Sequence, residues 1–250
     1  MGTMNQPIIQ LLGIDFCNIG IDTAVERLLA RPEGARLSYV VTPNADHIER
    51  LLRIPGLRPI YRRALFCLLD STLVSHVARH LGLATPPVVP GADLTEALLP
   101  HLSGKRVAVI GMDEPDFSKL VQRFPEISFI HYKPPMRLLH DVAAFNRTRD
   151  FVIDTQAAFT FFAVGSPVQE MLAYAASGEN QAVGVGLCIG SSLSFAAGTV
   201  KRAPLWMRRA GLEWIQRLAH NPRRLAGRYL VSDPLVLLAL SWTALREKFH

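Results

Sequence analysis

Cysteines are few in this chain of 250 residues, and metal-binding patterns are missing. Cys17, Cys67 and Cys188 are an odd number, lie far apart and sit in apolar stretches, so we expect free, buried thiols in a reducing compartment. No C-x-x-C pair and no His/Cys cluster indicates zinc. No Asp-x-Asp occurs either, so the usual clamp for a divalent metal on a nucleotide diphosphate is lacking. The sequence therefore predicts neither a metal nor another cofactor.

Long apolar segments are lacking as well. The longest uncharged run near the end of the chain, 234–245, has 12 residues, whereas a membrane-spanning helix needs about 20. The first residues do not have the basic and apolar regions of a secretion signal, and Gln6 does not suit N-myristoylation. We therefore expect a cytoplasmic protein without a spanning anchor.

Excess charge of one sign is confined to one segment near the end of the chain. Residues 198–229 hold eight lysines and arginines and one acid, Glu213, which gives +7. The whole chain carries +6, so the remainder sums to about −1 (6 − 7). The cations alternate with apolar residues, a mixture that favours an anionic lipid surface. Nucleic acid and ordinary packing of an amphipathic helix are the alternatives. The residues expected at the membrane are Trp206, Arg208, Arg209 and Trp214.

Short apolar runs alternate with helical patterns along most of the chain. The expected strands are 8–16, 37–43, 64–70, 105–111, 127–132, 159–165 and 182–188. The expected helices are 21–30, 44–53, 72–82, 92–102, 116–123, 137–147 and 166–177. This alternation is typical of an α/β fold, a mainly parallel sheet with helices on both faces. It stops near residue 198, which predicts a core of residues 1–197 and a basic helical C-terminal appendage of residues 198–250, broken at Pro222 and Pro234.

Polar residues and glycines follow several expected strands, at the edge where ligands bind in open α/β sheets. The segment 42–44 (Thr-Pro-Asn) follows the second strand, and Asp70 ends the third. Asn44 and Asp70 each have a structural alternative, which is to cap the next helix. The later strands end near Gly165, Gly184, Gly186 and Gly190. The last three glycines miss the dinucleotide-binding spacing G-x-G-x-x-G by one residue, so a nicotinamide site is not indicated.

Five segments together resemble the WecG/TagA/CpsF family of bacterial glycosyltransferases, over about residues 10–235. They are VVTPNADHIE (40–49), LLD (68–70), PGADL (90–94), GSPVQE (165–170) and, most specifically, AGTVKRAPLWMRRAGLEWIQRLAHNPRRLAGRYL (197–230). The resemblance implies a Rossmann-like core and an inverting, metal-independent transfer. The sugar would pass from a UDP-sugar to a polyprenyl-diphosphate-linked saccharide in exopolysaccharide or cell-envelope polymer synthesis. The enzyme would bind peripherally to the inner face of the cell membrane.

The resemblance also implies roles for individual residues. Asp70 matches the proposed catalytic base. The residues expected at the nucleotide-sugar donor are Thr42, Asn44, Gly165, Gln169, Gly186 and Ser194. The residues expected at the diphosphates and the acceptor are Arg217, Arg224 and Arg228.

Three departures from the family pattern leave part of this interpretation open. Ser71 stands where the family usually has glycine, Val168 where a basic residue is common, and Ser194 where a carboxylate is expected to contact uracil. A hydroxyl cannot give a ring N–H the charge-assisted bond of a carboxylate. Base specificity, sugar, acceptor and linkage therefore stay open, as does the oligomeric state, where a homo-oligomer is one option. A catalytically weak, membrane-bound assembly partner is the main alternative; no nucleic-acid partner is expected.

Overall fold

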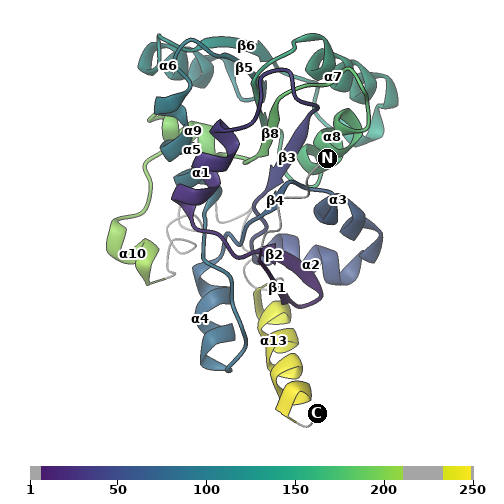
Figure 1. The fold of residues 1–250 in the computed structure, drawn as a ribbon, viewed down its shortest axis with the longest axis vertical. Coiled ribbons are helices and arrows are strands. Elements are labelled where there is room, and N and C mark those ends of the chain that lie inside the picture. The colour runs from purple at the N-terminus through teal and green to yellow at the C-terminus, as the bar shows by residue number, and fades with distance from the viewer. Residues whose placement is uncertain (1–6, 211–232, 249–250) are drawn as a thin grey trace.

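The structure, a computed structural model, describes residues 7–210 and 233–248. Within these ranges, six strands form one parallel sheet in the order β4-β3-β8-β7-β5-β6 (Figure 1). The strands are β3 (Ser38–Val41), β4 (Phe66–Cys67), β5 (Arg106–Gly111), β6 (Ser128–Tyr132), β7 (Phe159–Ala163) and β8 (Val185–Cys188). The predicted Rossmann-like α/β fold is confirmed.

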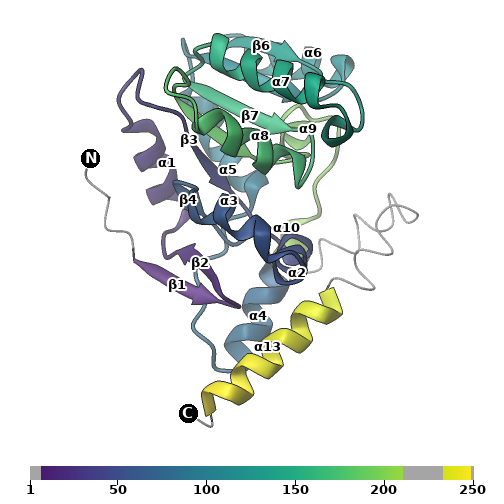
Figure 2. The same ribbon diagram turned by 90° about the vertical axis from the view of Figure 1, so that its right-hand side faces the viewer.

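Helices cover both faces of the sheet because successive strand residues point to opposite sides. In β3, Tyr39 and Val41 belong to the apolar core on one face, and Val40 to the core on the other. The helices on the first face are α2 (Ala45–Arg53), α3 (Arg58–Arg62), α7 (Val142–Asp154) and α8 (Val168–Ser177). The helices on the second face are α1 (Ile21–Leu29), α5 (Gly91–Leu98), α6 (Glu114–Arg123) and α9 (Ser192–Ala196), as Figure 2 shows for several of them.

Several predicted boundaries are wrong. The single strand expected at 8–16 is an antiparallel hairpin of β1 (Ile8–Leu11) and β2 (Ile14–Cys17). Its turn consists of Leu12 at φ 55° and Gly13 at φ 71°. Gly13 is the only turn signal there, because leucine rarely adopts this conformation. The third expected strand shortens to β4, and the helix expected at 137–147 begins only at Val142, where Asp141 Oδ1 accepts the Ala144 N–H at 2.9 Å. The short helices α3 and α9 were not predicted.

The C-terminal helix α13 (Asp233–Lys248) packs on the core. It contacts α2 and α4 (Thr72–His80), and α4 and α13 project together from the sheet (Figure 2). Val236, Leu240 and Ala244, one helical turn apart, are buried in the same core as α2 and α4. Among the described helices, none combines the length and the apolar character needed to cross a membrane. The division at residue 198 stays a prediction, since residues 211–232 lie outside the described ranges.

Candidate active site

The carboxyl ends of the parallel strands surround a cavity of about 710 Å³. This volume is in the range of sites for small molecules and cofactors. Six of the seven predicted core site residues line it: Thr42, Asn44, Asp70, Gly165, Gln169 and Ser194. The fold therefore gathers residues that are far apart in the sequence, as the strand-end argument predicted.

Asp70 directs its carboxylate toward the start of α5. Its Oδ2 accepts the backbone N–H of Gly91 at 3.2 Å. The next residue, Ser71, caps α4, because its Oγ accepts the N–H of Val74 at 3.2 Å. Ser71 thus caps the next helix, α4, whereas Asp70 binds the first N–H of α5 and also lines the cavity.

Gly91 allows this arrangement by its close approach to the Thr42 segment. A Cβ at this position would lie 2.8 Å from Thr42 Oγ1 and 3.4 Å from Ser192 Oγ. Thr42 is itself buried, and its Oγ1 donates to the carbonyl of Cys188 at 3.4 Å. Only glycine lets α5 begin so close to the end of β3. In the sequence Gly91 appears only within the PGADL segment of the family resemblance, because its contact with the distant Thr42 leaves no local signal.

Asn44 both caps α2 and lines the cavity. Its Oδ1 accepts the N–H groups of Asp46 at 3.1 Å and of His47 at 3.4 Å, while His47 Nδ1 accepts the Asn44 N–H at 3.1 Å. This reciprocal capping box fixes the first turn of α2 at the edge of the cavity. The structural alternative for Asn44 is therefore present, and its contact with a donor stays a prediction.

Gln169 connects α8 to the loop after β8. Its Oε1 accepts the N–H of Gly190 at 2.9 Å, and its Nε2 donates to Glu170 Oε1 at 2.8 Å. Both side chains are buried. Burial raises the pKa of the Glu170 carboxyl, although its hydrogen bond from Gln169 acts in the opposite direction. In this structure Gln169 therefore holds the loop that forms one wall of the cavity.

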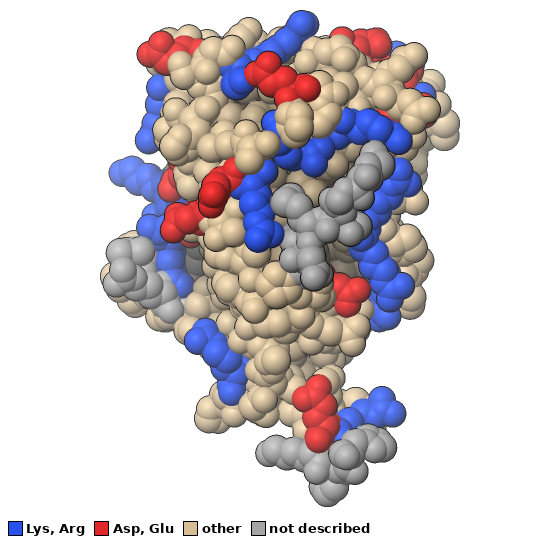
Figure 3. All heavy atoms as spheres, viewed as in Figure 1, with Lys and Arg blue, Asp and Glu red and all other residues tan. Residues whose placement is uncertain are grey.

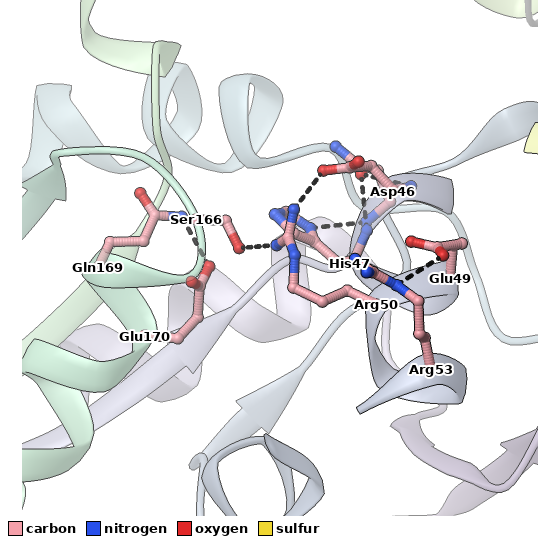
Figure 4. A network of polar contacts seen from close by, with 9 residues as sticks. Asp46, His47, Glu49, Arg50, Arg53, Ser166, Gln169 and Glu170 are labelled. Atoms are coloured by element: carbon pink, nitrogen blue, oxygen red, sulfur yellow. Dashed lines mark hydrogen bonds and ion pairs between the residues drawn. The ribbon is translucent and has the colours of Figure 1, made fainter. Parts of the chain in front are cut away.

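Arg50 joins two walls of the cavity, as Figure 4 shows. From α2 it donates to Ser166 Oγ at 2.8 Å, in the segment before α8, and to Asp46 Oδ2 at 2.8 Å. The Arg50 and Asp46 side chains are each 18% exposed, so water screens this pair less than a surface pair. The network fixes α2 relative to the Gly165 segment. Among residues 7–210 and 233–248, no group of three or more His, Cys, Asp and Glu is placed to hold a metal ion.

Gly186 lies elsewhere, which corrects its expected placement with the donor-site residues. It is an interior residue of β8, and a Cβ there would lie 2.9 Å from the Phe162 ring and 3.2 Å from Tyr39 Cβ. Its lack of a side chain serves packing between strand and core.

The appendage residues are only partly described. Trp214, Arg217, Arg224 and Arg228 lie outside the described residues. Trp206 and Arg209 belong to α10 (Leu205–Arg209), where Trp206 is 65% exposed. Arg208 pairs with Asp93 of α5 at 3.2 Å, and Arg202 pairs with the same carboxylate. Arg208, expected at the membrane, is therefore engaged by the core.

The chain is similar to known proteins over nearly its whole length. The model of the glycosyl transferase WecG/TagA/CpsF family matches residues 9–250. The chain is also similar to N-acetylglucosaminyldiphosphoundecaprenol N-acetyl-beta-D-mannosaminyltransferases of Staphylococcus aureus strains MW2 and NCTC 8325 / PS 47. Each is 27% identical over 246 residues, which cover 95% of this chain and 93% of the relative. The fold, the strand-end cavity and this match lead to one conclusion: the chain belongs to the WecG/TagA/CpsF family of glycosyltransferases.

Proposed function

We propose that this glycosyltransferase moves a sugar from a UDP-sugar to a polyprenyl-diphosphate-linked saccharide, in the synthesis of an exopolysaccharide or a cell-envelope polymer. The observation that carries the proposal is the Asp70 carboxylate, which lines a cavity of about 710 Å³ at the strand ends. The similar Staphylococcus aureus enzymes are named for an acceptor, N-acetylglucosaminyldiphosphoundecaprenol, and for transfer of N-acetylmannosamine, and both support the proposal.

Asp70 acts in this proposal as the general base. It takes the proton of the acceptor hydroxyl while that oxygen attacks the anomeric carbon, on the face opposite the leaving diphosphate, so the configuration inverts. The bond from the Gly91 N–H to Oδ2 orients the carboxylate. Negative charge that grows on the leaving diphosphate is neutralised by Arg217, Arg224 and Arg228, as the resemblance implies. The N-terminal ends of α2 and α8 border the cavity and favour the same charge.

Residues of α13 support a peripheral membrane location. Leu235, Leu238, Trp242 and Leu245 are 46%, 66%, 64% and 51% exposed. Their spacing of three, four and three residues places them on one helical face, away from the buried Val236, Leu240 and Ala244. The part of the surface over α4 and α13 is mainly uncharged in Figure 3, apart from a basic side chain over the lower part of α4 and charged side chains near the end of α13. We call the four exposed side chains of α13 the α13 stripe. We propose that the α13 stripe and Trp206 rest on the inner face of the membrane, where a polyprenyl-linked acceptor is held.

Two of the three departures from the family pattern lie at helix starts and leave the candidate base in place, which does not favour a catalytically weak assembly partner. Ser71, in place of glycine, caps α4, and Val168 is the first residue of α8. Both substitutions therefore have a place in the fold, and the Asp70 carboxylate is retained in the cavity.

A transfer assay tests the proposal. The full chain is mixed with vesicles that carry polyprenyl-diphosphate-N-acetylglucosamine and with a panel of UDP-sugars that includes UDP-N-acetylmannosamine, and the lipid products are identified by mass spectrometry. We expect a lipid-linked disaccharide with one of the donors. Vesicle binding without transfer from any donor would contradict the proposal and support the assembly partner.

A further inference from the structure

The two ends of the cavity lie at different strands of the sheet. Asp70 follows β4, whereas the loop after β5 borders the other end, four strand positions away. At about 4.8 Å per strand, the two ends are separated by about 19 Å across the sheet. If the sugar reacts at Asp70, as the proposed function requires, a donor that extends across the strand ends places its nucleoside base near β5.

Two carboxylates line that end, Asp113 and Asp116, and Asp113 is paired with Lys133 at 2.6 Å. Asp116 is the one held next to Ser194. It lies in the first turn of α6 and lines the cavity together with Ser194. Thr199 Oγ1 lies 3.0 Å from Asp116 Oδ2 and 3.0 Å from the Ser194 carbonyl oxygen. The Thr199 hydroxyl therefore holds Asp116 beside Ser194, although the two are 78 residues apart in the sequence (194 − 116).

We propose that Asp116 determines base specificity by accepting a hydrogen bond from the ring N–H of uracil. Ser194 supplies a hydroxyl that donates to a neighbouring uracil carbonyl. A carboxylate accepts hydrogen bonds and cannot donate, so it binds a ring N–H with a charge-assisted bond and repels an unprotonated ring nitrogen. Uracil carries such an N–H, whereas cytosine has a bare ring nitrogen at the equivalent position. The inference rests on the proposed function and adds the group that selects the nucleotide.

Asp116 also has an ordinary explanation, because an acidic residue in the first turn stabilises a helix. Glu114 provides the matched control for that explanation. It lies in the same turn of α6, its side chain is 74% exposed, it pairs with His131 at 3.1 Å, and it is not part of the cavity lining. Removing its charge changes the helix terminus and leaves the base end of the cavity unchanged.

The test measures the affinity of UDP and CDP for the full chain and for Asp116→Asn, Asp116→Ala and Glu114→Gln, by calorimetry, with thermal unfolding as a check of folding. We expect the parent protein and Glu114→Gln to prefer UDP by about 10- to 100-fold, the range for one charge-assisted hydrogen bond. The Asn side chain accepts from uracil and donates to cytosine, so Asp116→Asn should bind both within about threefold, mainly by gaining CDP affinity. Asp116→Ala should lose UDP affinity and gain less CDP affinity than Asp116→Asn, because it removes the repulsion of cytosine without adding a donor.

The outcomes separate this inference from the proposed function. A folded Asp116→Asn that keeps the parental UDP preference would overturn the role of Asp116, and so would an equal loss of both nucleotides in Asp116→Asn. If the parent protein binds neither UDP nor CDP, the proposed donor class itself is contradicted.

Discussion

Substitutions on the two faces of α13 should separate folding from membrane binding. Leu240 is fully buried against the core, whereas Leu238, two residues away, is 66% exposed. Leu240→Ala removes buried methyl groups and should lower the free energy of unfolding by about 2–5 kcal/mol. Leu238→Ala should change it by no more than about 0.5 kcal/mol, as for other surface positions.

The expected loss of membrane affinity follows from the exposed area. Full burial of a large apolar side chain is worth about 1.5–3 kcal/mol. Leu238 and Trp242 keep 66% and 64% of their surface exposed, so each contributes about 1–2 kcal/mol when lipid covers it. The double variant Leu238→Ala/Trp242→Ala should therefore bind vesicles about 30- to 1,000-fold more weakly.

Vesicle sedimentation and chemical denaturation measure the two effects. Binding is measured at high salt, which screens the contribution of the basic segment and isolates the apolar one. Parental vesicle affinity of the double variant would refute a membrane contact of the α13 stripe. An unchanged unfolding free energy of Leu240→Ala would refute the packing of α13 on the core.

Three further predictions follow from the cavity and its surroundings. Because burial raises the pKa of Glu170 above its ordinary 4.5, the fold favours its protonated form and should lose stability as the pH rises from about 4.5 through the raised value. In denaturation experiments at a series of pH values, Glu170→Gln should become more stable relative to the parent as the pH rises across that window. Unfolding free energies that change with pH in the same way in both proteins would contradict this. Gly91→Ala places a methyl group 2.8 Å from Thr42 Oγ1, so it should lower the free energy of unfolding by about 1–3 kcal/mol and also lower turnover. The control Gly56→Ala, whose added methyl group would have no atom within 4 Å, should change neither quantity. Transfer should persist in excess EDTA, since the chain has no Asp-x-Asp; loss in EDTA with recovery in Mg²⁺ would contradict the arginine-based neutralisation.

Much of the sheet can be predicted because buried parallel strands are apolar on both faces. β5 and β7 are apolar except for Arg106 and Thr160, and their predicted ranges differ from the observed ones by one or two residues. The hairpin at 8–17 is missed because its turn has a single glycine signal, Gly13, within an apolar run, and the other turn residue is Leu12.

The candidate site likewise contains residues that can be predicted from the sequence and residues that cannot. Thr42 and Asp70 are found from sequence because parallel strands bring their carboxyl ends to one edge. The contact of Gly91 with Thr42 and that of Asp116 with Thr199 are not found from sequence, because the partners are distant in the chain. Gly186 resembles part of a ligand loop in sequence, but the Phe162 ring packs where its side chain would be.

The central claim is that Asp70 is the general base of sugar transfer, and the turnover of Asp70→Asn tests it most directly. Transfer to the lipid-linked acceptor and donor affinity are measured together, with Ser71→Ala as the neighbouring control. Ser71→Ala loses the cap of α4 and should lower stability by about 0.5–2 kcal/mol with turnover retained. Asp70→Asn should lower turnover by at least about 100-fold with donor affinity nearly unchanged. Turnover of Asp70→Asn within a factor of about two of the parent would contradict the account.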